Sequence, residues 1–228
     1  MKVDKLHIRS RFKNLENVKV DFDENHLMTV IVGRNGSGKS NVLEALVAIF
    51  RNLDLGEAPT FSYELDYQLG EEAGVKWYDV KVDADPDRGT LAKQYQVYVK
   101  DKHDSKADFK LTPFSKVKRD KKTKQAEFLP NFLFAYYSGP SDRLEKYFRK
   151  HRDDYYRNLL YNKLDLKADI RSLFYAKPYH SQFVLLAFFL SDENSPQRKF
   201  IKEHLGIEGL DSIHFVMRQP EWAKLKGE

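Results

Sequence analysis

The sequence predicts an α/β fold whose core is a strand, a glycine-rich turn and a helix, accompanied by an antiparallel β subdomain and a helical lobe. Residues 28–33 are a continuous apolar run ending in glycine, which is typical of a fully buried central strand. Residues 40–50 then carry apolar side chains at helical spacing. Three alternating segments between residues 61 and 101, separated by Gly, Asp and Pro, predict antiparallel strands.

Further elements are expected on both sides of this core. Residues 3–9 and 17–22 alternate and predict an N-terminal β-hairpin. A second buried strand is predicted at residues 132–137, and a helix after residue 140. The last elements expected are a buried helix at 179–190, a short amphipathic helix at 197–205 and a late strand, SIHFVMRQP, ending at Pro220. We therefore expect a nucleotide-binding lobe with the β insertion over residues 1–139 and a helical lobe plus the late strand over residues 140–228.

Composition narrows the classes of protein that the chain could represent. The 228 residues include no cysteine, which excludes disulfides and thiolate metal sites. The N-terminus lacks the apolar core of a signal peptide, and the longest apolar run, residues 183–190, is too short to span a bilayer. A cytosolic protein without a membrane partner is therefore expected. The net charge of +5 permits a polyanionic partner but does not require one.

The chemistry is concentrated in the turn that follows residues 28–33. Gly33-x₄-Gly38-Lys39-Ser40 matches the Walker A pattern, and the predicted strand before it and helix after it supply the expected context. Glycines allow positive φ, so that successive N–H groups can point at phosphate oxygens. Lys39 would supply a cation to the β- and γ-phosphates, and the Ser40 hydroxyl would ligate Mg²⁺. The expected ligands are ATP and Mg²⁺, held by Gly33, Arg34, Asn35, Gly36, Ser37, Gly38, Lys39 and Ser40.

The segments LHIRSRFKNLENVKVDF and MTVIVGRNGSGKSNVLEAL resemble the N-terminal half of an ABC-type ATPase head of the RecF, SMC and OLD kind. In that group a first strand ends near a Phe-Lys pair, here Phe12-Lys13, and Asn41 closes the loop. The resemblance covers about the first fifty residues and implies that Asn41 and Lys13 lie near the nucleotide. For Lys13 a solvent-facing position at a strand end is an equal alternative. The segment YYSGPSDRLEKYF resembles ATPases of bacterial restriction and anti-phage systems.

The resemblance also identifies departures from the family pattern. Such heads hydrolyse ATP between two copies and carry a signature loop of the LSGG type, which this sequence lacks. The Walker B candidate is the acidic pair Asp192-Glu193 after an apolar run, where carboxylates could serve Mg²⁺ and water. A buried helix ending in a solvated acidic turn is the favoured alternative. We therefore expect the catalytic half to lie beyond Glu228, and this chain alone to be weak or inactive as an ATPase.

Two other regions are candidates for contact with ligands. The family carries a glutamine after a strand near residues 135–138, and this sequence has none there, so Ser138 or Asp142 could stand in for it, with Ser138 near the metal. A basic loop at residues 116–124 and a basic helix at residues 143–157 could bind nucleic-acid phosphates. A solvated loop and an amphipathic helix are the favoured alternative.

Three functions remain open from the sequence. The resemblance implies an ATP-binding head that forms a homodimer through the nucleotide and gates an action on DNA or on an effector protein. The second is a nucleotide-binding assembly module without turnover. The third is a P-loop kinase, against which the long β-rich insertion argues.

Overall fold

The computed structural model describes residues 1–22, 26, 28–120, 122–139, 141–161 and 170–216. Backbone contacts divide the chain into two compact units, residues 1–176 and 177–228. This boundary differs from the expected one at 139/140, because the first helix and strand after residue 140 pack on the earlier part of the chain. Along the described residues, no helix is long and apolar enough to cross a membrane.

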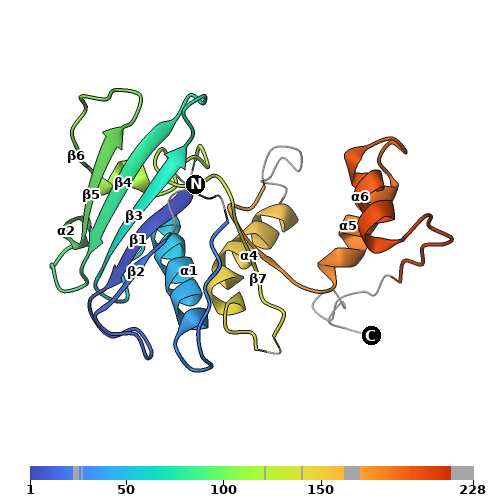
Figure 1. The fold of residues 1–228 in the computed structure, drawn as a ribbon, viewed down its shortest axis with the longest axis horizontal. Helices are drawn as coiled ribbons and strands as arrows, with labels where there is room; N and C mark the ends of the chain where they lie inside the picture. Colours follow the sequence, from blue (N-terminus) through green and yellow to red (C-terminus); the bar gives the residue numbers. More distant parts are fainter. Residues whose placement is uncertain (23–25, 27, 121, 140, 162–169, 217–228) are drawn as a thin grey trace. The chain divides into compact units, whose positions relative to one another are not determined.

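The first unit is built on a six-stranded antiparallel sheet in the order β2–β1–β3–β4–β5–β6 (Figure 1). The predicted N-terminal hairpin is confirmed as β1 and β2, and the predicted antiparallel segments as β3, β4 and β5. β1 also pairs with β3, so the hairpin and the insertion form one sheet. The bounds are β1 Lys2–Ile8, β2 Val18–Asp21, β3 Tyr63–Gly70, β4 Trp77–Ala84, β5 Tyr95–Asp101 and β6 Lys110–Thr112.

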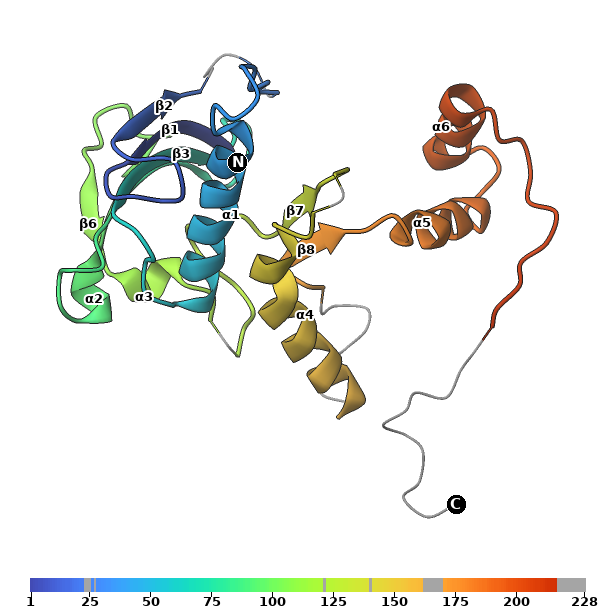
Figure 2. The ribbon, with the colours of Figure 1, turned by 90° about the horizontal axis from the view of Figure 1, so that it is seen from below.

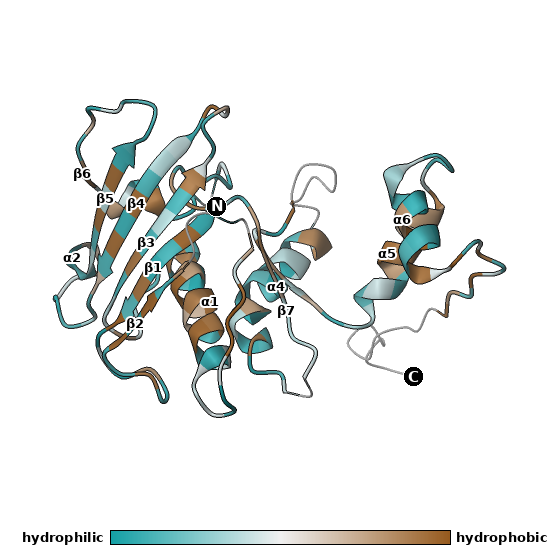
Figure 3. Ribbon diagram, viewed as in Figure 1, coloured by the Kyte–Doolittle hydropathy of each residue, from teal (hydrophilic) through white to brown (hydrophobic). Residues whose placement is uncertain are grey.

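Helix α1, Lys39–Leu55, covers one face of this sheet (Figure 2). The apolar residues of α1 recur at helical spacing and pack with the buried residues of the strands in one core. Hydrophilic and hydrophobic residues alternate along these strands (Figure 3). The helix ends at Gly56, whose φ of 65° suits a left-handed cap. Two short helices, α2 Leu91–Gln94 and α3 Phe114–Val117, connect the strands beside the sheet.

A smaller layer completes the first unit. β7, Leu133–Tyr136, and β8, Leu173–Ala176, pair in parallel, and α4, Glu145–Leu160, packs on β8 and α1. The predicted strand at 132–137 is therefore present. Its burial is only partial, because Phe134 and Tyr136 are exposed. A second apolar cluster joins the layers through Val47, Leu144, Phe148 and Leu173.

The expected central strand at residues 28–33 is not formed. The segment has no strand assignment, and Met28, Val30 and Val32 are 70% to 83% exposed, while Ile31 packs against the core. A strand requires a hydrogen-bonded neighbour, and in the described part of the chain no strand pairs with this segment.

The second unit contains two helices that pack on each other, α5 His180–Phe189 and α6 Pro196–Leu205. The helices predicted at 179–190 and 197–205 are thus confirmed in position. The predicted burial of the first is wrong, because no residue of α5 is buried and Phe183 is 60% exposed. Residues 212–216 of the expected late strand carry no strand, and residues 217–220 lie outside the described residues.

Candidate functional site

The phosphate-binding loop is shaped by two glycines at positive φ. Gly36 has a φ of 83° and Gly38 a φ of 95°, and α1 begins at Lys39 directly afterwards. A Cβ atom on Gly38 would lie 2.7 Å from Leu15 Cδ2, so the backbone approaches its neighbour more closely than any side chain allows. Residues 33–37 are exposed, which leaves the loop open to a ligand.

The start of α1 gives this loop a positive end. N–H groups in the first turn of a helix point outward along its axis and favour an anion there. Lys39 Nζ donates to the carbonyl oxygens of Gly33 at 2.6 Å and Arg34 at 2.8 Å, so the ammonium group lies directly against the loop. Ser40 is half-buried in the same turn. A phosphate group fits this combination of helix end and cation.

A tight turn of residues 12–15 is clamped onto the loop. Phe12 and Leu15 exchange backbone hydrogen bonds of 2.8 and 2.9 Å, and Lys13 at the turn has a φ of 57°, unusual for a lysine. Asn14 Nδ2 donates to the Gly36 carbonyl at 3.2 Å, and Asn14 Oδ1 accepts from Asn41 Nδ2 at 2.5 Å. Asn41 therefore closes the loop through Asn14, a residue that the sequence analysis did not select.

Lys13 is held beside helix α1 by an ion pair with Glu44. Lys13 Nζ forms a short ion pair with the Glu44 carboxylate, which is fully buried on α1. Burial alone would raise the pKa of Glu44, but hydrogen bonds from Lys13, Tyr147 and Lys146 outweigh it, so the pKa lies below its ordinary value. The sequence analysis did not select Glu44; the signal that could have identified it is an acidic residue among the apolar positions of α1.

The oxygen chemistry of the loop suits Mg²⁺. Magnesium binds few protein oxygens, often a hydroxyl or carboxylate, and completes its shell with phosphate oxygens and water. Ser40 offers such a hydroxyl in the first turn of α1. Across the residues that the structure places, no group of three or more His, Cys, Asp or Glu side chains forms a metal cluster.

A family model described as an AAA ATPase domain matches residues 1–206. The chain belongs to the AAA ATPase domain family. This AAA ATPase domain therefore has a P-loop α/β fold and the nucleotide-binding function of an ATPase, with Mg²⁺ as the usual companion ion. No curated protein and no solved structure matches the chain.

The acidic pair lies in the second unit of this AAA ATPase domain. The apolar run before Asp192 and Glu193 forms helix α5, and both carboxylates are exposed in the turn after it. Asp192 Oδ1 accepts from the backbone N–H of Asn194 at 2.8 Å, a local turn contact. The structure thus agrees with a helix followed by a solvated acidic turn. In the first unit, Ser138 lies two residues after the end of β7 and is exposed, as is Asp142.

Most basic side chains of the proposed nucleic-acid surface already have acidic partners. On α4 and just before it, Arg143 and Lys146 contact Glu44, and Lys150 contacts Glu57. The remaining pairs are Arg152 with Glu145 and Asp153, Arg157 with Asp154, Arg119 with Asp54, and Lys116 with Glu127. These pairs offset part of the charge that the sequence suggested for DNA, although Arg143 and Lys146 share the single carboxylate of Glu44. Lys121 of the basic loop lies outside the described residues.

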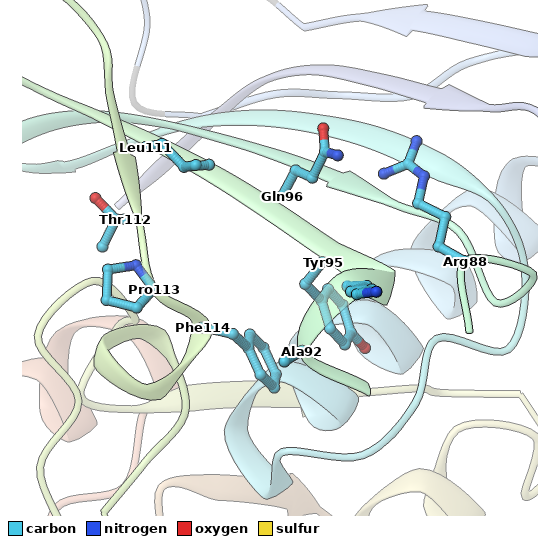
Figure 4. Close-up of a pocket in the computed structure, with 9 residues that line it drawn as sticks. Arg88, Ala92, Tyr95, Gln96, Leu111, Thr112, Pro113 and Phe114 are labelled. Carbon is cyan, nitrogen blue, oxygen red and sulfur yellow. The ribbon is translucent and has the colours of Figure 1, made fainter. Parts of the chain in front are cut away.

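A separate hollow of about 690 Å³ lies beside strands β5 and β6 and the short helices α2 and α3 (Figure 4). Its floor includes the stacked rings of Tyr95 and Phe114, with centroids 4.3 Å apart. No residue of the phosphate-binding loop lines it. This hollow is therefore separate from the candidate nucleotide site, whose loop is open at the surface.

Proposed function

We propose that this AAA ATPase domain is an ATP-binding head of the RecF/SMC-like ABC class, in which bound ATP holds two heads together and so gates an action on DNA or an effector protein. The observation that carries the proposal is the clamped loop, in which Gly36 and Gly38 hold the backbone open and Lys39 lies across it. Its supporting sequence feature is the GRNGSGKSN run together with the first-strand turn. The turn is packed against the loop, as the resemblance leads one to expect.

The residues would act on ATP in a simple order. Lys39 would exchange its two carbonyl acceptors for β- and γ-phosphate oxygens, and the first-turn amides of α1 would hold the phosphates. The Ser40 hydroxyl would hold Mg²⁺ against them. Bound triphosphate would then add charge at the surface that a second copy could satisfy, so that ATP favours the dimer by mass action.

Lys39→Ala tests the nucleotide site directly. We expect the variant to lose binding of a fluorescent ATP analogue by about a hundredfold or more, because a charge-assisted contact to phosphate is removed. Circular dichroism should be unchanged, since the hydrogen bonds described for the Lys39 side chain go to loop carbonyls. Equal affinity in wild type and variant would refute the assignment of the loop.

One observation favours a second candidate, a nucleotide-binding module without turnover. Asp192 and Glu193 follow a helix and are exposed, which does not provide the buried strand end of a Walker B site. Phosphate release at saturating Mg-ATP separates the two. Turnover well below about one per second is expected for this chain, whereas a faster rate would show a complete catalytic set.

A further inference from the structure

Glu44 is a fully buried charge of the first unit with four described side-chain partners, three of them cations. It lies one helical turn after Ser40, so the two residues share a face of α1. Its side chain has no exposed surface. Besides Lys13, its carboxylate accepts from Tyr147 at 2.9 Å and contacts Lys146 Nζ at 3.2 Å and Arg143 Nε at 3.6 Å.

More cations surround Glu44 than are needed to attach α4 to α1. A buried carboxylate must be paired to be tolerated, but here three cations face one carboxylate, so positive charge remains in excess. Glu57, two residues after the other end of α1, also contacts α4, and among the described residues its carboxylate pairs with two cations, Arg51 and Lys150. The surplus at Glu44 lies on the helix face of Ser40, where phosphate oxygens are expected.

The backbone of Lys13 supplies a second, independent observation. A lysine at a φ of 57° is strained, and such strain persists where the surroundings enforce it, often at functional sites. Here Asn14 is bound to Gly36 and Asn41, and Leu15 packs against Gly38. The turn is thus held at the phosphate-binding loop, while Glu44 fixes the lysine head.

We propose that Glu44 is a positioning residue of the nucleotide site: it holds Lys13 beside the phosphate-binding loop for contact with the terminal phosphate of ATP and links this contact to the N-terminal end of α4. The inference rests on the proposed function and adds to it a route by which the γ-phosphate acts on another element. The Lys13 ammonium group has three N–H donors, so it can contact phosphate while it stays paired with Glu44, whose carboxylate also contacts Arg143, Lys146 and Tyr147. The coupling is reciprocal, so α4 also influences the affinity for ATP.

A double-mutant cycle tests this role. Calorimetric titrations with Mg-ATP and Mg-ADP compare wild type, Lys13→Met, Glu44→Gln and the double variant. We expect Lys13→Met to weaken Mg-ATP about tenfold and Mg-ADP much less, as one charged contact to the terminal phosphate is lost. Glu44→Gln should weaken Mg-ATP by roughly threefold to tenfold, and the double variant should be no weaker than Lys13→Met, because the two residues act through one contact.

Glu57→Gln is the matched control. It removes a second carboxylate, 35% exposed, that links Arg51 of α1 to Lys150 of α4 and has no described contact with Lys13 or the loop. We expect it to lower thermal stability while leaving affinity for Mg-ATP unchanged. An equal loss of affinity in Glu57→Gln, or additive losses in the double variant, would overturn the positioning role and leave Glu44 as structural support.

If Glu44→Gln fails to fold, hydrogen exchange in the wild type and in Lys13→Met still tests the proposal. Mg-ATP should alter exchange at residues 145–150 of α4 in the wild type, and the alteration should be absent in Lys13→Met, whose side chain is partly exposed and replaceable. Unchanged α4 exchange in a wild type that binds Mg-ATP would overturn this inference alone. Lack of Mg-ATP binding by the wild type would overturn the proposed function as well.

Discussion

Position 38 carries the tightest constraint of a single residue on the phosphate-binding loop. Gly38→Ala would combine a strained φ of 95° with a Cβ atom 2.7 Å from Leu15 Cδ2, so the buried Leu15 side chain must shift. We expect a loss of about 1–3 kcal/mol in the free energy of unfolding together with loss of ATP binding. Gly89→Ala is the control, since Gly89 has a φ of 81° and open space around it. It should lower stability by about 1 kcal/mol and leave ATP affinity intact.

Asp54 makes stability depend on pH. Burial alone would raise the pKa of its carboxyl, but the hydrogen bond from His151 at 2.8 Å and the charge of Arg119 at 2.6 Å outweigh it, so the pKa lies below the ordinary 3.8. A depressed pKa stabilises the fold above the unfolded value, and this contribution disappears as the pH falls through the folded value.

Asp54→Asn should therefore lower the free energy of unfolding at pH 7 by about 3 kcal/mol, because Arg119 and His151 lose their buried partner. Below pH 3.8 the difference between wild type and variant should shrink. Urea unfolding at a series of pH values measures both effects. A constant difference at all pH values would contradict the lowered pKa.

At the scale of elements, α6 offers a test of local helix formation. Ser195 caps its N-terminus by accepting from the backbone N–H of Arg198 at 3.3 Å, and Pro196 occupies the first helical position. Ser195→Ala should destabilise α6 by about 1 kcal/mol and speed hydrogen exchange at residues 196–205. Thr90→Ala is the control, because Thr90 precedes α2 without a side-chain cap bond. Slower or equal exchange in Ser195→Ala would contradict the cap.

The elements that could be predicted from the sequence are those that pair or pack with segments close to them in the chain. The alternation in β3, β4 and β5 determines which face is buried, and these strands pair with their neighbours in the chain. The helix α1 and its loop follow from spacing and glycines. The burial predicted for residues 28–33 and for α5 was wrong. An apolar run indicates that burial is favourable, but it does not indicate which surface covers the run.

The candidate site was predictable only in part for the same reason. Gly33 to Asn41 follow from a local motif, whereas Asn14 and Glu44 act through contacts over 22 and 31 residues of chain separation. No single-sequence period encodes such contacts. The ion pairs of Arg143 and Lys146 with Glu44, and of Lys150 with Glu57, are likewise tertiary, so the basic helix taken in isolation suggested DNA.

For the whole molecule, association is the property that distinguishes a gated head from a single binding module. We expect Mg-ATP to shift the wild type from monomer to dimer in sedimentation velocity, because the nucleotide completes a shared surface. Lys39→Ala should remain monomeric under the same conditions. A wild type that binds Mg-ATP and stays monomeric at all concentrations would favour the module.

The exposed segment at residues 28–33 has a practical consequence for such work. These six uncharged residues are mostly β-branched or apolar and include no proline; Met28, Val30 and Val32 are exposed, and no strand in the described part of the chain pairs with the segment. Edges of this kind template strand addition between molecules and lead to aggregation. Concentrated samples should therefore precipitate with time whether or not nucleotide is present. A charged substitution at Val30, which is 70% exposed, should act as a gatekeeper and extend the lifetime of the protein in solution.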